Sequence, residues 1–202
     1  MEFKYIYLVI HGKIQINEEQ KTYIGQIDIP LSEEGKEQVH RLSSMLSGLK
    51  ITADYCSDLP RSIETAKKIA GWHRIHPVIK PELREISLGE WEGLTFAEVI
   101  KRYPEEFRQR GADIVNFRPP GGESFADCSK RVINALQEIK SHSSGNIVIS
   151  GHAGVNRIIL CHALGMPVDN LFNISQDYGC LNIIFAGNSH YRVTLLNETG
   201  SI

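Results

Sequence analysis

Along the chain, short continuous runs of hydrophobic residues alternate with stretches in which hydrophobic residues recur every three or four positions. Continuous β-branched or aromatic runs predict buried strands, and the wider spacing predicts helices with one buried face. The continuous runs predict strands at 4–9, 53–57, 75–79, 147–150, 180–185 and 191–196. The spaced stretches predict helices at 60–71 and 153–164, and further helices that begin after Ser32, Thr95 and Ser124.

Local signals mark several ends of these elements. Thr95 and Glu98 have the spacing of a capping box at a helix start, and Pro104 would end or interrupt that helix. Gly165 follows the last predicted helix, where a left-handed residue often closes a helix. The tripeptide at 187–189, Gly-Asn-Ser, separates the last two strands and predicts a hairpin.

The order of these elements predicts the fold class. Strands that alternate with helices form a mostly parallel sheet covered by helices on both faces. We therefore predict an α/β fold, a three-layer α/β/α sandwich whose mostly parallel central sheet has an antiparallel edge. A chain of 202 residues can enclose one full core, so we expect a single domain over 1–202. We expect residues 88–123 to form a lid over the sheet edge where ligands of such folds bind.

The charge and composition of the chain limit the kinds of partner and cofactor that we expect it to bind. The formal net charge of -2, without a long Lys/Arg run, argues against nucleic acid and membrane surfaces. The first apolar run is too short to span a membrane, so we expect a cytoplasmic protein. The four cysteines form no C-x-x-C pair and are expected as buried thiols. No cofactor or metal is predicted, because His73 and His76 lack the further ligands of a zinc site.

Polar residues that can carry chemistry follow several of the predicted strands. His11 follows the first strand, Arg61 opens the helix after the second, Glu85 follows the third, and His152 follows the strand at 147–150. Since carboxyl ends of parallel strands meet at one edge, we expect these side chains to converge. The set suits phosphoryl transfer, in which an imidazole attacks phosphorus, cations hold its oxygens and an acid protonates the leaving group.

Taken alone, each residue has a simpler interpretation. A histidine after a strand is more often an ordinary loop residue, and Glu85 can pair with Arg84. Arg61 can be a solvated cation, although a positive charge at a helix start opposes the helix dipole and suggests an anionic partner. Only the combination, in this order and at strand ends, indicates a site.

The same segments resemble the motifs of the histidine phosphatase (phosphoglycerate mutase-like) superfamily over nearly the whole chain. The resemblance rests on residues 7–12, 25–35, 57–66, 85–93, 120–124 and 151–154. Residues 25–35 are similar to the family pattern G-x-x-D-x-P-L-[ST]-x-x-G, and 151–154 read Gly-His-Ala-Gly. The compact length and the Gly-Gly-Glu-Ser loop resemble the α-ribazole-phosphate phosphatase branch of cobalamin assembly more than the longer glycolytic mutases.

The resemblance implies roles for individual residues. His11 would be the nucleophile that forms a phosphohistidine, and Glu85 would protonate the leaving alkoxide and later accept a proton from water. Arg61 and His152 would hold the phosphate oxygens. The substrate-binding residues implied are Gly12, Asn17, Gly25, Arg61, His152 and Ala153. We also expect Gly12 to fix the tautomer of His11 through a main-chain hydrogen bond.

Ile10 departs from the family motif, because the resemblance places an arginine before the histidine. An isoleucine supplies neither charge nor hydrogen-bond donors to a phosphate. Three alternatives follow: a slowed phosphatase in which Lys13 reaches back to the phosphate, a degenerate member that only binds a phosphorylated ligand or partner, or an introduced substitution. A mutase-like phosphotransferase is a further alternative.

The implied substrate is a small phosphorylated metabolite. Its identity is expected to depend on the predicted lid, where Arg102, Arg108, Arg110 and Arg118 either meet further anionic groups or form an ordinary solvated surface. A homodimer through the edge strands at 180–196 is a further expectation, since unpaired strand edges invite pairing.

Overall fold

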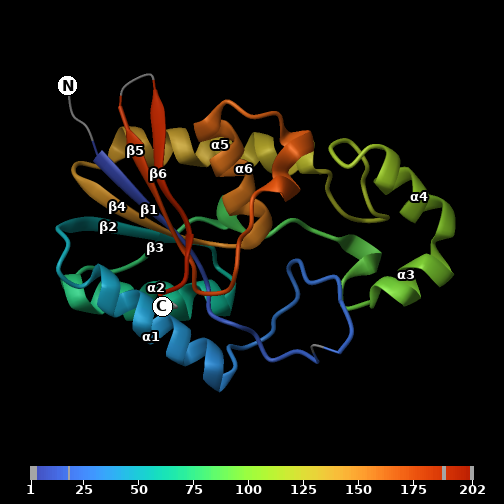
Figure 1. The fold of residues 1–202 in the computed structure, drawn as a ribbon, viewed down its shortest axis with the longest axis horizontal. Coiled ribbons are helices and arrows are strands. Elements are labelled where there is room, and N and C mark those ends of the chain that lie inside the picture. Colours follow the sequence, from blue (N-terminus) through green and yellow to red (C-terminus); the bar gives the residue numbers. More distant parts are fainter. Residues whose placement is uncertain (1–3, 18, 188–189, 201–202) are drawn as a thin grey trace.

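The computed structural model of this chain describes residues 4–17, 19–187 and 190–200. Its six strands form one sheet in the order β3-β2-β4-β1-β5-β6 (Figure 1). The strands are Lys4–Ile10 (β1), Ile51–Cys56 (β2), Val78–Ile79 (β3), Asn146–Gly151 (β4), Leu181–Ala186 (β5) and Tyr191–Glu198 (β6). The first four strands of this order run parallel, whereas β5 pairs antiparallel with both β1 and β6. The predicted fold class is confirmed.

Helices cover both faces of the sheet (Figure 1). Helices α1 (Glu33–Leu46) and α2 (Pro60–His73) lie together on one face, and α5 (Phe125–His142) and α6 (Ala153–Leu164) lie on the other. Helices α3 (Phe96–Arg102) and α4 (Pro104–Ala112) lie apart from the sheet, at the right of Figure 1. Three short 3-10 helices occur at Pro81–Leu83 (η1), Gly89–Trp91 (η2) and Val168–Asn173 (η3).

The core lies on both sides of the central strands. Ile147, Val148 and Ile149 of β4 are fully buried, as expected for a strand covered by helices on both faces. Ile147 and Ile149 belong to the cluster that packs under α5 and α6, while Val148 belongs to the cluster under α1 and α2. This packing fixes the register of β1, β2 and β4, whose carboxyl ends therefore meet at one edge of the sheet.

Most predicted elements are present, with shifts at their ends. The capping box of Thr95 and Glu98 is confirmed, and Ser124 caps α5 as predicted. The helix after Ser32 ends at Leu46, and the strand predicted at 75–79 is only the exposed pair of β3 at the sheet edge. Pro104 starts α4 directly after α3, because proline is tolerated in a first helical turn. Strands β5 and β6 pair as predicted, but positions 188 and 189 of the hairpin lie outside the described residues.

Other expectations concern cysteines, metals and membranes. The four cysteines are buried free thiols, as predicted. Among the described residues, no group of three or more His, Cys, Asp or Glu side chains is placed to hold a metal ion. No helix in the described part of the chain is long and apolar enough to cross a membrane.

Candidate active site

A pocket of about 300 Å³ lies at the carboxyl edge of the sheet. Strand β1 ends directly before His11, and Arg61 is in the first turn of α2, which follows β2. Glu85 follows η1 and reaches the same edge. The pocket is lined by Ile10, His11, Ile14, Ile24, Arg61, Glu85, Ala153, Gln176, Asp177 and Tyr178. The structure thus brings together three of the four residues predicted to carry chemistry in the pocket lining, and the ring of the fourth, His152, packs edge-on against that of His11 with 5.1 Å between their centroids.

The main chain fixes the tautomer of His11. Its Nδ1 lies 2.8 Å from the carbonyl oxygen of Gly12. A carbonyl can only accept, so Nδ1 carries the proton and Nε2 carries the lone pair. Burial, and secondly the charge of Arg61, lower the pKa of His11 to about 3. The predicted bond to Gly12 is therefore present, and at neutral pH His11 is an uncharged imidazole whose Nε2 carries no proton.

Gly12 was expected among the substrate-binding residues, but its second role in the structure is steric. A Cβ atom at Gly12 would lie 2.1 Å from the carbonyl oxygen of Gly35 at the start of α1. No side chain fits at that distance, so the strand end and α1 can meet only through glycine. Gly12 therefore packs the loop after His11 against α1 and does not itself line the pocket.

Arg61 is buried and its guanidinium is held on three sides. Its Nε donates to Nε2 of His11 over 3.2 Å. Its two terminal nitrogens donate to the carbonyl oxygens of Ile27 and Gly25, at 2.8 and 2.5 Å. A guanidinium has five N–H groups, so N–H groups remain for a ligand after these three bonds. The pKa of Arg61 is lowered by burial, while Glu85 and Glu92 nearby act in the opposite direction.

Glu92 orients the loop that holds Arg61. Its carboxylate accepts from the backbone N–H groups of Gly25 and Gln26, at 3.0 and 2.7 Å, and from the N–H of Leu88 at 3.1 Å. A Cβ atom at Gly25 would lie 2.3 Å from the Glu92 carboxylate and 2.4 Å from the carbonyl oxygen of Ile86. Gly25 is thus required for close packing, and it meets Arg61 through its carbonyl oxygen.

His152 is fully buried at the end of β4. Its Nε2 lies 2.7 Å from Oγ of Ser57. Its Nδ1 is buried and has no hydrogen-bond partner within the described part of the chain. Burial, followed by electrostatic coupling to His11 and Arg61, lowers the pKa of His152 well below its usual value. A buried ring nitrogen without a partner is costly unless a ligand satisfies it.

The carboxylate of Glu85 is aimed into the pocket by two backbone N–H groups. Its oxygens accept from the N–H of Ile86 at 2.9 Å and of Gly154 at 3.0 Å. Gly154 is in the first turn of α6, which begins at Ala153 without a side-chain cap. N–H groups at an uncapped helix start attract anionic groups, so α6 holds Glu85 beside the space in front of His11.

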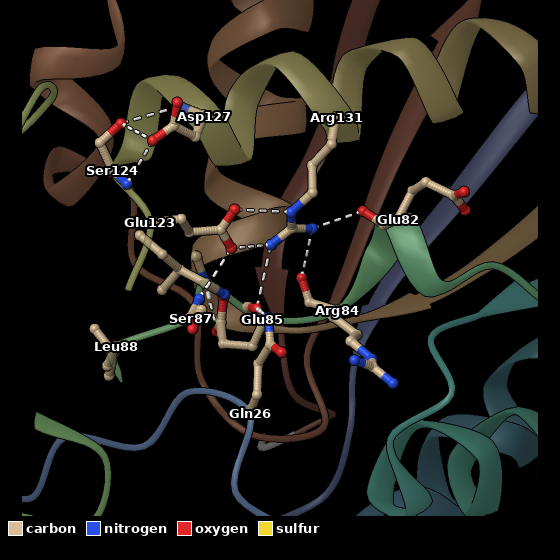
Figure 2. Close-up of polar contacts among 12 residues, drawn as sticks. Gln26, Glu82, Arg84, Glu85, Ser87, Leu88, Glu123, Ser124, Asp127 and Arg131 are labelled. Carbon is tan, nitrogen blue, oxygen red and sulfur yellow. Dashed lines mark hydrogen bonds and ion pairs between the residues drawn. The ribbon is translucent and has the colours of Figure 1, made fainter. Parts of the chain in front are cut away.

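A second network fixes the backbone of Glu85 from behind (Figure 2). The guanidinium of Arg131 on α5 donates to the carbonyl oxygens of Glu82, Arg84 and Glu85, at 2.7, 2.8 and 3.2 Å. Arg131 also forms a two-point ion pair with Glu123, whose carboxylate accepts from the N–H of Ser87 at 2.9 Å. The segment that carries Glu85 is therefore anchored to α5 on both sides of this residue.

The structure does not bring Asn17 to the pocket. Its side chain is exposed and accepts from the N–H of Glu19 at 3.0 Å. The loop after Gly12 turns so that Ile14 faces the pocket, while Asn17 lines a separate hollow. Lys13 does not reach the pocket either, since its Nζ pairs with Glu34 at 2.6 Å. A phosphate contact by Asn17 or Lys13 has no support in this geometry.

The pattern of strand ends missed one wall of the pocket. Gln176, Asp177 and Tyr178 precede β5 and come from the far end of the chain. The N–H of Gly179 donates to the carbonyl oxygen of His11 at 3.0 Å, and the rings of Tyr178 and His11 lie 5.7 Å apart. Because β5 runs antiparallel to β1, its start lies beside the end of β1. The predicted antiparallel edge was the available signal for this wall.

Comparison with known proteins identifies the family. The model of the histidine phosphatase superfamily (branch 1) matches residues 6–199 of this chain. The chain belongs to this superfamily. By homology, it is a histidine phosphatase family phosphatase, and this family implies a phosphorylated small-molecule substrate.

Individual relatives extend over nearly the whole chain. The adenosylcobalamin/alpha-ribazole phosphatase of Escherichia coli is 28% identical over 196 residues, which span 96% of this chain and 95% of the relative. Phosphoserine phosphatase 1 of Hydrogenobacter thermophilus is 30% identical over 193 residues, 95% of this chain and 91% of the relative. The crystal structure of a putative alpha-ribazole-5'-P phosphatase from E. coli superposes with a TM-score of 0.90 at 26% identity, covering 97% of both chains.

Proposed function

We propose that this histidine phosphatase hydrolyses phosphomonoesters through a phosphohistidine on His11, and that Ile10 slows the reaction. The observation that carries the proposal is the state of His11, whose Nδ1 proton is held by the Gly12 carbonyl. Its unprotonated Nε2 therefore lies at the pocket beside a cation and a carboxylic side chain. An imidazole in this state is a competent nucleophile toward phosphorus.

Binding of the phosphoryl group would use the donors around His11. The phosphate would displace the Nε of Arg61 from the lone pair of His11 and accept from the remaining N–H groups of Arg61. The unpartnered Nδ1 of His152 would donate to a second oxygen, and the backbone N–H of Ala153 would donate to a third. These contacts neutralise charge that spreads over the phosphoryl oxygens in the transition state.

Two chemical steps would follow. In the first, Nε2 of His11 bonds to phosphorus, the P–O bond to the alcohol breaks, and Glu85 gives its proton to the departing alkoxide. In the second, Glu85 accepts a proton from a water molecule that attacks phosphorus, and the P–N bond breaks. The electron pair of that bond returns to Nε2, so phosphate leaves and His11 regains its starting tautomer.

Ile10 explains why we expect a slow reaction. We propose that it occupies the position of the arginine that precedes the nucleophile in the family motif. Ile10 is buried at the end of β1, lines the pocket and pairs in register with Gly151. A charge-assisted hydrogen bond contributes about 1.5–3 kcal/mol, and arginines that act on phosphoryl transition states contribute roughly 10³–10⁵ in rate.

The alternative from a different class is a binding protein that holds a phosphorylated ligand without turnover. The bond from Arg61 to Nε2 of His11 favours this alternative, because the lone pair of the nucleophile is occupied. Changing Glu85 to Gln separates the two. The enzyme would lose turnover and keep ligand binding, whereas a binding protein would show intact binding and no turnover in either form. A mutase would instead move phosphate between two alcohols without net release.

Similarity to alpha-ribazole phosphatases makes α-ribazole phosphate the first natural ester to test. We further propose that the chain works as a single domain in which residues 88–123 act as a lid. None of the residues that line the pocket belongs to this segment, so a lid there would contact those parts of the substrate that extend beyond the pocket.

The test of this function is phosphate release from a small aryl phosphate. Three proteins are compared: the protein itself, Ile10→Arg, and His11→Ala as the blank. We expect the protein to exceed the blank and Ile10→Arg to be faster still. Equal rates for all three proteins, with α-ribazole phosphate as well as the aryl ester, would contradict the proposal.

A further inference from the structure

One part of the pocket wall is apolar. Ile10, Ile14 and Ile24 all line it, and the ring of Tyr178 stands 5.7 Å from that of His11. Ile10 and Ile14 are buried within the protein, so their side chains are fixed by packing. A charged group placed against these side chains would lose its water without gaining hydrogen bonds.

The charged side chains around the pocket also disfavour a substrate with a second anionic group. Arg61 is the one cationic side chain among the lining residues, and Glu85 and Asp177 contribute two carboxylates. His11 adds no charge at neutral pH, because its pKa is lowered to about 3. Arg61 is therefore the one lining cation that faces the phosphoryl group, while Glu85 and Asp177 would repel a second anionic group on the substrate. The cation Arg157 lies near both carboxylates but does not line the pocket.

Asp177 is held in place at the mouth of this pocket. Its carboxylate accepts from Nδ2 of Asn197 at 2.7 Å, and its backbone N–H donates to Oδ1 of the same residue at 2.8 Å. This pair ties the loop before β5 to the end of β6. A fixed carboxylate repels an anionic group more effectively than a mobile one, because it cannot move away at low energetic cost.

We infer that the pocket selects phosphomonoesters whose alcohol part is uncharged, such as an aromatic alcohol, and that Asp177 excludes esters carrying a carboxylate. The inference rests on the proposed function. It separates the esters of neutral aromatic alcohols from carboxylated esters such as phosphoserine and phosphoglycerate.

A matched pair of aryl esters tests this selectivity. The 4-carbamoylphenyl and 4-carboxyphenyl phosphates have nearly the same shape and differ in one negative charge. We expect kcat/KM for the carbamoyl ester to be at least about tenfold higher, which is the lower limit of discrimination for a small change in a hydrophobic pocket. Asp177→Asn should bring the two values within about threefold of each other, mainly by improving the carboxyl ester.

Two control variants make the result specific. Asp169→Asn removes a carboxylate from the exposed 3-10 helix η3, outside the pocket, and should leave the ratio unchanged. Ile24→Thr should slow the carbamoyl ester about tenfold. Ile16→Thr, on the same loop but outside the pocket-lining set, should leave that ester unaffected.

The outcomes distinguish this inference from the proposed function. If both esters are hydrolysed equally well, or if Asp177→Asn leaves the ratio unchanged, the selectivity is wrong and the phosphatase activity stands. If neither ester is hydrolysed, the proposed function fails, and calorimetric binding of the two esters to His11→Ala still tests the selectivity. Equal affinities in that measurement would overturn the inference, and tighter binding of the carbamoyl ester would support it.

Discussion

Arg61 donates a hydrogen bond from Nε to Nε2 of His11 over 3.2 Å, while the carbonyl of Gly12 holds the other ring nitrogen. The two bonds define one tautomer of the imidazole and place a cation against its lone pair. The uncharged form of the His11 ring is favoured, because the positive charge of Arg61 disfavours a second positive charge on the neighbouring imidazole.

Removal of Arg61 should therefore raise the pKa of His11. In Arg61→Gln we expect a pKa above about 3 and below the ordinary value of 6.5, because burial remains the larger cause of the shift. An NMR titration of the ring protons measures this. Arg41→Gln, on the exposed side of α1, serves as the control and should leave the titration unchanged. An unchanged pKa in Arg61→Gln would show that Arg61 does not act on His11.

The same pKa sets the acid side of the rate profile. A nucleophile that titrates at about 3 stays unprotonated through pH 5, so His11 should not limit kcat/KM between pH 5 and 8. In Arg61→Gln the acid limb should move toward neutral pH as the pKa of His11 rises. Rates measured against pH for both proteins check this, and identical acid limbs would count against the assignment of His11.

Arg131 should act on catalysis only through Glu85. Arg131→Lys keeps the charge but cannot serve three carbonyls and Glu123 at once. We expect kcat to fall about 10- to 100-fold with KM nearly unchanged, and the free energy of unfolding to fall by about 1.5–3 kcal/mol. Arg118→Lys, which changes an exposed pair with Asp127, is the matched control. A variant that loses stability but keeps its kcat would contradict a positioning role.

Glu92 should act on phosphate binding. Glu92→Gln replaces a carboxylate oxygen by an NH₂ group that faces backbone N–H groups of the 25–27 loop. The loop carbonyls that hold Arg61 should then shift, so we expect KM to rise about tenfold or more, the effect of losing one charge-assisted hydrogen bond. Steady-state kinetics with an aryl phosphate measure it. Glu90→Gln, two residues earlier on the same segment, should change KM by less than about twofold.

Asp54 should make stability depend on pH in a predictable direction. It is fully buried on β2, and burial raises its pKa well above the usual value. In the unfolded chain an aspartate has a pKa of about 3.9, so above this pH the folded state binds more protons than the unfolded state. Stability therefore falls as pH rises, by up to about 1.4 kcal/mol per pH unit until the folded-state pKa is reached.

The variant Asp54→Asn cannot ionise and should lack this loss. The difference in Tm between Asp54→Asn and the parent protein should therefore become more positive from pH 4 to pH 7. Thermal unfolding followed by circular dichroism measures both proteins. Asp169→Asn, an exposed change, should show no such trend. A difference in Tm that stays constant with pH would mean that Asp54 is ionised in the folded protein.

The sequence allowed prediction of those parts of the site that depend on local pattern. His11, Arg61 and His152 follow strands of the parallel set, so their meeting at one edge followed from the fold class. The bond from His11 to Gly12 was also predictable, because it joins neighbours in sequence. Glu85 was placed correctly, although its supports come from α5 and α6, far away in the chain.

Features that depend on long-range packing were not predictable. The wall formed by Asp177 and Tyr178 depends on where an antiparallel strand begins. Asn17 was expected at the phosphate, but the loop after Gly12 turns Ile14 inward instead. The direction of that loop is set by the contact of Gly12 with Gly35, which no periodicity reveals. The ends of some elements differ from the prediction for a similar reason. Strand β3 is shorter than predicted, since at the sheet edge it can pair only with β2.

The central claim is that His11 carries the phosphoryl group. The most direct test mixes Glu85→Gln with a ³²P-labelled aryl phosphate and stops the reaction rapidly without acid. An aryl alcohol leaves with little help from an acid, whereas hydrolysis of the phosphohistidine needs Glu85 as base, so the intermediate should accumulate in this variant. We predict that Glu85→Gln carries a protein-bound phosphate that is labile to acid and stable to base. The double variant that combines Glu85→Gln with His11→Ala should carry none. Phosphate release by the parent protein with no such intermediate, or label on a residue other than His11, would contradict the claim.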